Sequence, residues 1–240
     1  MISKSQIKLI CSLQQKKYRK QEQLFLVEGI KGIQELVQSD FDVHEIFTTN
    51  PDLTFSIPGK ITIISDTELK KISALATPNS CLALFKIPKA TKIAEKGLIL
   101  ALDAIRDPGN LGTIIRLCDW FGIESIFCSE NTVDVYNPKV VQATMGSISR
   151  VNVFYGDLEM FLKNTKLPVF GTFMEGENIY QKKLEQEGIL ILGNEANGIS
   201  ENIENLVNQK LTIPRFGKLQ RTESLNVATA TAIILSEFRR

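Results

Sequence analysis

Residues 102–116 read LDAIRDPGNLGTIIR: an apolar strand-like run ends in a Pro-Gly-Asn turn, and a helix that carries an arginine in its second turn begins at once. Residues 193–198 (GNEANG) and 223–228 (ESLNVA) likewise place polar groups at the end of an apolar strand or at the start of a helix. Ligands of open α/β sheets bind outside the carboxyl ends of the strands. We therefore predict an α/β fold in which these three segments converge on one site.

The overall composition is that of an ordinary soluble protein. The 240 residues, 43% of them hydrophobic and 23% charged, suffice for one large domain or two small ones. No apolar run reaches the length of a membrane span, and the first residues lack the apolar core of a signal peptide. The four scattered cysteines form no CxxC pair and are expected to be reduced. We expect a cytoplasmic protein with no membrane contact.

Positive charge is concentrated in two short stretches, although the net charge is only +1. Residues 1–20 and 210–221 contain basic residues and no acid. Such patches can supply phosphate contacts without a high overall charge. Taken singly, each stretch is better explained as a solvated face. The basic residues are Lys4, Lys8, Lys16, Lys17, Arg19 and Lys20 in the first stretch, and Lys210, Arg215, Lys218 and Arg221 in the second.

Alternating helical and strand-like patterns divide the chain into two α/β units. Residues 1–88 are expected to form a small α/β sandwich, and residues 89–97, which are rich in lysine, a linker. Residues 98–240 form the second unit. Strands are expected over 24–27, 43–49, 61–64 and 81–87, and then over 98–102, 125–128, 151–155, 169–173, 189–192 and 211–213. Helices are expected over 3–16, 29–39 and 224–240, with Ser224 as the cap of the last of these. Asp66 and Asn110 are each expected to cap a further helix, and two more helices are expected to open at Asn137-Pro138 and at Asp157.

We call the three segments at 102–116, 193–198 and 223–228 the first, second and third motifs. In the first motif, a shared helix face is expected for Gly109, Gly112, Thr113 and Arg116, because they are spaced i, i+3, i+4 and i+7. The glycines leave open space beside the arginine, whose planar fork can bind a phosphate or an oxyanion near the helix N-terminus. Taken alone, this segment is better explained as a capped helix with a surface arginine.

The second and third motifs each have an ordinary structural alternative. Glycine and asparagine in residues 193–198 favour tight turns whose exposed backbone groups can bind an adenine edge or a carboxylate, and Glu195 adds a charge. A plain strand-to-helix turn explains that segment about equally well. Asn226 is a poor helix former in the first turn of an otherwise small and apolar helix, which favours a functional role. The alternative is a capping arrangement in a dimer-forming helix.

Other common sites lack their patterns. The chain has no GxGxxG and no Walker sequence, which argues against a dinucleotide site or an ATP phosphate loop. Its one histidine, His44, lies in the first unit and is expected on a strand surface, so a Ser-His-Asp triad is not supported. No cluster has metal-ligand spacing, and no metal is predicted.

Together, the three motifs resemble in order and spacing the signature motifs of the SpoU family of RNA ribose 2′-O-methyltransferases, within the SPOUT superfamily. The first unit is similar, by pattern and position, to the small ribosomal-protein-like substrate-binding domain that precedes the catalytic domain in many members. The stretches that carry the resemblance are LDAIRDPGNLGTIIRLCDWFG (102–122), LILGNEANGIS (190–200) and IPRFGKLQRTESLNVATATAI (213–233), with NPKVVQATMGSISRV (137–151) as a fourth.

The resemblance implies a parallel-sheet domain with a deep trefoil knot, a rare exception to unknotted topology. It also implies S-adenosylmethionine as methyl donor, a homodimer through the knotted domain, and a structured RNA as substrate, with ribosomal RNA favoured over transfer RNA. One alternative is a non-catalytic RNA-binding protein that keeps the knotted fold, which predicts loss of the cofactor pocket or of Arg116. A Rossmann enzyme of another class would require the missing glycine fingerprint.

Matched position by position, the resemblance implies roles for two sets of residues. Two departures stand out: the segment between Pro214 and Ser224 is longer than in common members, and Gln142 stands where an arginine is frequent. The implied catalytic residues are Asn110, Arg116, Glu195, Ser224 and Asn226. The implied cofactor-binding residues are Thr172, Leu192, Gly193, Asn194, Gly198, Ile213, Pro214 and Leu225.

The reaction implied by the family is in-line attack of a ribose 2′-hydroxyl on the sulfonium methyl group, helped mainly by positioning. Since arginine is essentially always protonated, a role for Arg116 as base is chemically demanding. Our hypothesis is that Arg116 holds the neighbouring phosphate and stabilises the developing alkoxide, while Asn110 fixes the guanidinium. We further expect residues 1–88 to supply most of the RNA affinity.

Overall fold

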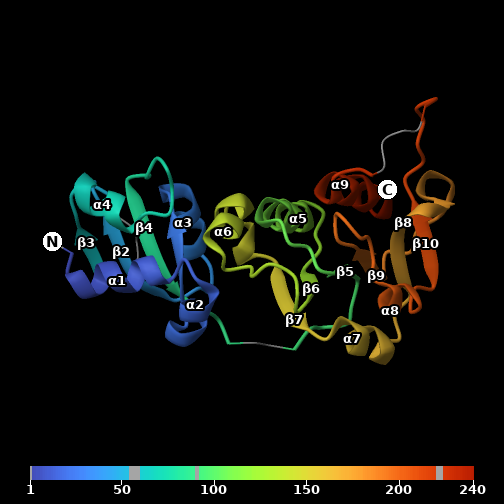
Figure 1. Cartoon of the computed structure of the whole chain (residues 1–240), viewed down its shortest axis with the longest axis horizontal. Helices are drawn as coiled ribbons and strands as arrows, with labels where there is room; N and C mark the ends of the chain where they lie inside the picture. Colours follow the sequence, from blue (N-terminus) through green and yellow to red (C-terminus); the bar gives the residue numbers. More distant parts are fainter. Residues whose placement is uncertain (1, 54–59, 90–91, 220–223) are drawn as a thin grey trace. The chain divides into compact units, whose positions relative to one another are not determined.

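The computed structural model describes residues 2–53, 60–89, 92–219 and 224–240 (Figure 1). The chain forms two compact units, the first made of Met1–Ala90 and Asp134–Ser149 and the second of Thr91–Val133 and Arg150–Arg240. Alternation of helices and strands in both units confirms the predicted α/β class. The return of residues 134–149 to the first unit was not predicted from the sequence. Within the described ranges, no helix is long and apolar enough to cross a membrane.

The first unit is built on a four-stranded sheet of order β1-β4-β2-β3. β2 and β3 are parallel and the other neighbours are antiparallel. The predicted helix over 3–16 ends earlier, at Ser12, and a second helix that the sequence did not predict begins at Lys16. The strands are β1 (Leu24–Glu28), β2 (Val43–Thr48), β3 (Lys60–Ile63) and β4 (Cys81–Lys86); the helices are α1 (Lys4–Ser12), α2 (Lys16–Glu22), α3 (Ile30–Val37), α4 (Asp66–Ile72) and α6 (Pro138–Thr144), followed by the 3-10 turn η1 (Ser147–Ser149).

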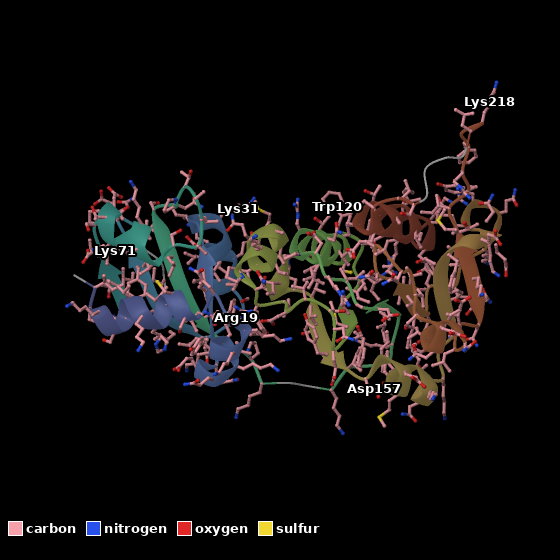
Figure 2. The ribbon with its side chains drawn as sticks, in the orientation of Figure 1. Arg19, Lys31, Lys71, Trp120, Asp157 and Lys218 are labelled. Carbon is pink, nitrogen blue, oxygen red and sulfur yellow. The ribbon has the colours of Figure 1, made fainter. Side chains whose placement is uncertain are left out.

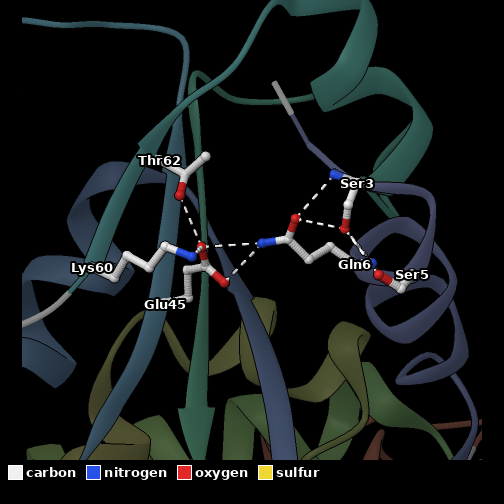
Figure 3. Close-up of polar contacts among 6 residues, drawn as sticks. All are labelled: Ser3, Ser5, Gln6, Glu45, Lys60 and Thr62. Carbon is white, nitrogen blue, oxygen red and sulfur yellow. Dashed lines mark hydrogen bonds and ion pairs between the residues drawn. The ribbon is translucent and has the colours of Figure 1, made fainter.

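A polar cluster joins the start of α1 to the sheet (Figure 3). Ser3 and Gln6 form a capping box, in which each side chain accepts a hydrogen bond from the other residue's backbone N–H. The Gln6 side chain also donates to the nearly buried carboxylate of Glu45 at 3.2 Å. Glu45 accepts a further hydrogen bond from Thr62 at 2.8 Å and pairs with Lys60 at 3.2 Å. These contacts satisfy a carboxylate that would otherwise be costly to bury.

Arg19 does not belong to the exposed basic stretch predicted from the sequence. It is only 2% exposed, its Nη2 lies 2.5 Å from Asp134 Oδ2, and its Nη1 donates to the Leu13 carbonyl at 2.8 Å. Asp134 is the first residue of the returning segment. Arg19 therefore holds that segment to the first unit and is not available to RNA.

Replacing Arg19 by alanine is expected to lower the free energy of unfolding by about 3 kcal/mol, because removal of one partner leaves the other charge poorly compensated. Urea denaturation followed by circular dichroism measures this change. Lys20→Ala is the matched control, since Lys20 is exposed, and it is expected to change stability by less than about 0.5 kcal/mol. Equal effects of the two substitutions would contradict a stabilising role for the ion pair.

The second unit is a six-stranded parallel sheet of order β10-β8-β9-β5-β6-β7, with every predicted strand present. The chain runs from β5 outward to β6 and β7 and then returns to the other side, where β9 lies beside β5. β5 and β9 therefore flank a topological switch point. The strands are β5 (Leu98–Leu102), β6 (Ser125–Ser129), β7 (Asn152–Gly156), β8 (Val169–Asn178), β9 (Gly188–Leu192) and β10 (Gln209–Thr212).

Helices cover this sheet and lie side by side where α5 meets α9 (Figure 1). One core cluster includes Phe127 and Phe161, whose stacked rings have centroids 4.2 Å apart. The short helix α8 and the 3-10 turn η2 were not predicted. The elements are α5 (Pro108–Trp120), α7 (Leu158–Asn164), η2 (Ile179–Gln181), α8 (Glu201–Glu204) and α9 (Val227–Phe238).

Three helix caps differ from the prediction, whereas Asn137 and Asp157 cap α6 and α7 as predicted. In α5, Pro108 occupies the first helical position, so the cap is the residue before it and the helix begins earlier than expected. The last helix, in contrast, begins later than expected, at Val227 rather than at residue 224. The observed caps are Ser65 in place of Asp66, Asp107 in place of Asn110, and Asn226 in place of Ser224.

Candidate active site

The carboxyl ends of β5 and β9 lie together at the switch point. Leu102 pairs with Leu192, and the next backbone N–H, that of Asp103, donates to the Leu192 carbonyl at 2.9 Å. Asp103 is 8% exposed, and its carboxylate accepts hydrogen bonds from Ser200 N and Oγ at 2.8 and 2.7 Å. Asp103, which the sequence reasoning missed, thus holds the loop after β9 against the loop after β5.

The loop after β9 turns back on itself tightly, as its glycines and asparagines predicted. A Cβ on Gly193 would lie 2.2 Å from the Gly198 carbonyl carbon and 2.3 Å from Ile199 N, so a side chain is excluded there. Asn194 and Gly198 exchange two backbone hydrogen bonds of 2.9 and 2.8 Å. The Asn194 side chain donates to the Ala104 carbonyl at 2.7 Å, a second link to the loop after β5.

Asn110 is the centre of a hydrogen-bonded chain that joins all three motifs. Its Nδ2 donates to Glu195 Oε1 at 2.8 Å, and its Oδ1 accepts from Asn226 Nδ2 at 2.9 Å. Asn226 Oδ1 accepts from the backbone N–H groups of Ala228 and Thr229, so the same side chain caps α9. Residues 85 and 116 positions apart in the sequence therefore meet. The structure has the convergence that the sequence predicted.

Arg116 and Ser224 do not join this chain. Both residues are exposed, and within the described part of the protein no hydrogen bond links either of them to Asn110. Arg116 follows Asn110 by six positions, which is about 9 Å along the helix axis. The hypothesis that Asn110 fixes the Arg116 guanidinium is therefore wrong for this structure, because Glu195 and Asn226 occupy the Asn110 amide. The arginine is left open to a ligand.

Most of the predicted cofactor residues lie at or after the paired parts of three neighbouring parallel strands, β8, β9 and β10. Thr172 lies directly after the last β8 residue that pairs with β9, and Ile213 and Pro214 directly follow β10. Leu225, 48% exposed, precedes Asn226. The others, which end β9 or follow it, are Leu192, Gly193, Asn194 and Gly198.

All four cysteines are free, and burial raises the pKa of the Cys118 and Cys128 thiols, which makes thiolate chemistry unfavourable there. The described residues contain no group of three or more His, Cys, Asp or Glu side chains placed to hold a metal ion. The polar groups that the three motifs supply include the exposed Arg116 guanidinium, the Glu195 carboxylate and the side-chain amides of Asn110, Asn194 and Asn226.

Comparisons with known proteins agree with this geometry. The SpoU rRNA Methylase family model matches residues 97–236, and the MRM3-like substrate binding domain model matches residues 4–83. The 23S rRNA (guanosine(2553)-2′-O)-methyltransferase RlmP of Bacillus subtilis is 30% identical over 95% of this chain and 93% of its own.

Solved structures cover the whole chain. A structure described as a TrmH-family RNA methyltransferase from Porphyromonas gingivalis is 36% identical, with a TM-score of 0.91 over 100% of this chain and 98% of its own. The AdoMet-bound rRNA methyltransferase from Sinorhizobium meliloti is 26% identical, with a TM-score of 0.87 over 100% of this chain and 96% of its own.

Proposed function

This chain belongs to the SpoU rRNA methylase family, and from that premise we propose that it transfers a methyl group from S-adenosylmethionine to a ribose 2′-hydroxyl of RNA. Ribosomal RNA is the favoured substrate, because RlmP acts on 23S rRNA, and transfer RNA is second. The observation that carries the proposal is the Glu195–Asn110–Asn226 chain, which unites the three motifs at the switch point.

The residues at the sheet edge fit S-adenosylmethionine, which supplies an electrophilic methyl group on a positively charged sulfur. Ile213, half-buried, and Leu225, exposed, offer apolar surface for an adenosine, and the turn at 193–198 offers backbone hydrogen-bonding groups, whereas Leu192 is only 1% exposed. Space is open at Gly198, where an added Cβ would meet nothing within 4 Å. The AdoMet in the Sinorhizobium meliloti relative supports this assignment.

Each residue of the site has a proposed task. Arg116 binds the phosphate beside the target ribose and stabilises negative charge on the attacking oxygen, for which its planar fork is suited. Asn110 and Asn226 hold the loops in place, and Glu195 orients Asn110 by accepting its hydrogen bond. Ser224, exposed just before Asn226, provides a further polar contact to the substrate.

The test of this function is incubation of the protein with tritiated S-adenosylmethionine and total RNA, followed by separation of ribosomal from transfer RNA. Label is expected in ribosomal RNA. Label in transfer RNA alone would move the substrate assignment to the second candidate. RNA binding without any label would favour the non-catalytic alternative.

We propose that the second unit, predicted as residues 98–240, is knotted, forms a homodimer and acts in the cytoplasm. The knot is supported by the family and by the return of the chain's last helix to Asn110. The dimer is supported by Trp120, an indole at the end of α5 that is 84% exposed (Figure 2). Tryptophan is enriched in the cores of protein interfaces relative to the rest of the surface.

Trp120→Asp is expected to convert the dimer into a monomer, because a charge would have to be buried in the interface. Light scattering after size exclusion measures the mass. Met160→Asp is the control, since Met160 is also exposed but lies on α7. A wild-type monomer, or a dimer that survives Trp120→Asp, would contradict this interface.

We propose that residues 1–88 bind RNA, as predicted, but through fewer basic residues, since Arg19 is buried. Lys16→Ala combined with Lys17→Ala, both exposed on α2, is expected to weaken binding of 23S rRNA and to lower the slope of log affinity against log salt by about one per lysine. Lys70→Ala combined with Lys71→Ala on α4 is the control. Unchanged slopes for the α2 pair would contradict this assignment. Deletion of 1–88 is less informative, because it also removes the partners of residues 134–149.

A further inference from the structure

In the second unit, β8 and β10 end side by side, and the chain continues past both ends as exposed segments. The last residues of the two strands, Asn178 and Thr212, pair with each other. Tyr180 follows Asn178 by two positions, and Phe216 follows Thr212 by four. Beyond β10 the chain projects past the sheet (Figure 1). Two aromatic side chains therefore leave the same end of one strand pair.

The rings of Tyr180 and Phe216 form an exposed pair. Their centroids are 6.4 Å apart, and their planes are inclined by 32°. Tyr180 is held in place, because its backbone N–H donates to the Asn178 side chain at 3.0 Å and its neighbour Ile179 is fully buried. Phe216 is 83% exposed, and an added Cβ on Gly217, next to it, would meet nothing within 4 Å. Most of the Phe216 side chain is therefore open to a flat ligand.

Basic residues alternate with apolar ones on the segment that follows β10. Residues 215–219 read RFGKL, and residues 210–221 contain no acid. Both basic residues of RFGKL are exposed, and Figure 2 shows Lys218 at the tip of the projecting segment. The charge of Glu177, near the end of β8, is compensated by its ion pair with Lys182. Aromatic rings interleaved with cations are typical of surfaces that bind unpaired nucleic acid.

The aromatic pair lies close to residues assigned to the cofactor. Ile213 and Pro214 directly follow β10. Phe216 is two positions beyond Pro214, which limits the separation of their Cα atoms to about 7 Å. A nucleotide whose ribose meets the methyl donor would thus have its neighbours in the RNA within reach of Phe216. Stacking on the ring requires such a neighbour to be unpaired, since bases inside a helix already stack on one another.

We propose that Phe216, supported by Tyr180, stacks on an unpaired base of the RNA substrate next to the nucleotide that is methylated, and that Lys218 contacts the adjoining phosphate. The inference rests on the proposed function, because it takes RNA as the substrate and S-adenosylmethionine as the donor. It gives the second unit a preference for single-stranded loops or ends of RNA over continuous helices. Every base has a face that can stack, so the preference is for unpaired RNA rather than for a particular sequence.

The first test measures the methylation kinetics of the full-length protein with 23S rRNA. Phe216→Leu, which keeps an apolar side chain but loses the ring, is expected to raise the KM for RNA about tenfold, as for loss of one base stack. Phe216→Trp is expected to keep the wild-type KM, because an indole also stacks. Leu219→Ala, at an exposed apolar residue of the same segment, is the control and is expected to leave the KM unchanged. The Kd for S-adenosylmethionine is expected to stay the same in all three variants.

The second test detects the stack itself through the fluorescence of Phe216→Trp. The wild-type protein, whose only tryptophan is Trp120, supplies the background signal. Single-stranded poly(U) is expected to quench the introduced indole, whereas the duplex poly(A)·poly(U) is expected to leave its emission unchanged. Equal quenching by the two polymers, or quenching by neither, would overturn the inference.

The outcomes separate this inference from the proposed function. Methylation by the wild-type protein together with an unaltered KM for Phe216→Leu would overturn the inference alone. Quenching by single-stranded RNA without methylation of any RNA would uphold the stacking surface and overturn the proposed function. A raised Kd of Phe216→Leu for S-adenosylmethionine would make Phe216 part of the cofactor site, and its conversion from dimer to monomer would assign the ring to a second copy of the chain. Either of these two results would overturn the inference.

Discussion

Replacement of Arg116 by lysine is expected to slow methyl transfer about 100-fold, the size of effect seen when one donor to a developing oxyanion is removed. Lysine keeps the charge but loses the planar fork that can bind a phosphate and the attacking oxygen together. Arg116 is exposed on α5, so the substitution leaves the core intact. Single-turnover methylation at saturating RNA measures the rate, and filter binding measures the RNA affinity, which is expected to change little.

Arg240→Lys is the matched control for Arg116→Lys, because Arg240 is exposed at the end of the chain and lies outside the three motifs. It is expected to leave rate and affinity unchanged. Near-normal turnover of Arg116→Lys, with unaltered RNA binding, would mean that the fork geometry is unimportant and that only a positive charge is needed.

Replacement of Asn110 by alanine is expected to reduce the methylation rate by a similar factor, about 100-fold, because it removes both hydrogen bonds that connect Glu195 and Asn226. Misplacement of reacting groups by even about 1 Å carries a penalty of that order. The melting temperature is expected to stay near that of the wild type, because Asn110 is only half-buried and the N-cap of α5 is Asp107. Thr113→Ala, one turn further on the exposed side of α5, is the control.

Asn226→Ser separates the two roles of Asn226, which caps α9 and donates a hydrogen bond to Asn110. Serine can still cap α9, but it lacks the amide that donates to Asn110. Its activity is expected to fall as for Asn110→Ala while stability is retained, whereas Asn226→Ala also loses about 1 kcal/mol of capping. Full activity of Asn226→Ser would show that the bridge between the motifs is dispensable.

The sequence was sufficient to predict the parallel sheet and the meeting of the three motifs. Apolar runs mark the strands, and parallel strands bring polar residues that follow them to one edge, so Asn110 and Glu195 were placed together correctly. Helical geometry also argued against one part of the hypothesis: at 3.6 residues per turn, six positions place Asn110 and Arg116 about 120° apart around the helix, on different faces.

Other features depend on tertiary partners that leave no local signal. Asp103 looks like any acid after a strand, and only its hydrogen bonds to Ser200, 97 positions away, reveal its role. Arg19 looks like its lysine neighbours until Asp134 is placed beside it. For the cap of α5, the signal was present but overlooked, since a proline at the first helical position marks Asp107.

The most direct measurement is the identity of the modified nucleoside. RNA methylated in vitro with deuterated-methyl S-adenosylmethionine is digested to nucleosides and analysed by mass spectrometry, with the wild-type protein, Asn110→Ala and Arg116→Lys in parallel. The expected product is a 2′-O-methylnucleoside with the label on the ribose, strongly reduced in both variants. Label on a base, or ribose label undiminished in both variants, would contradict a ribose methyltransferase built from these three segments.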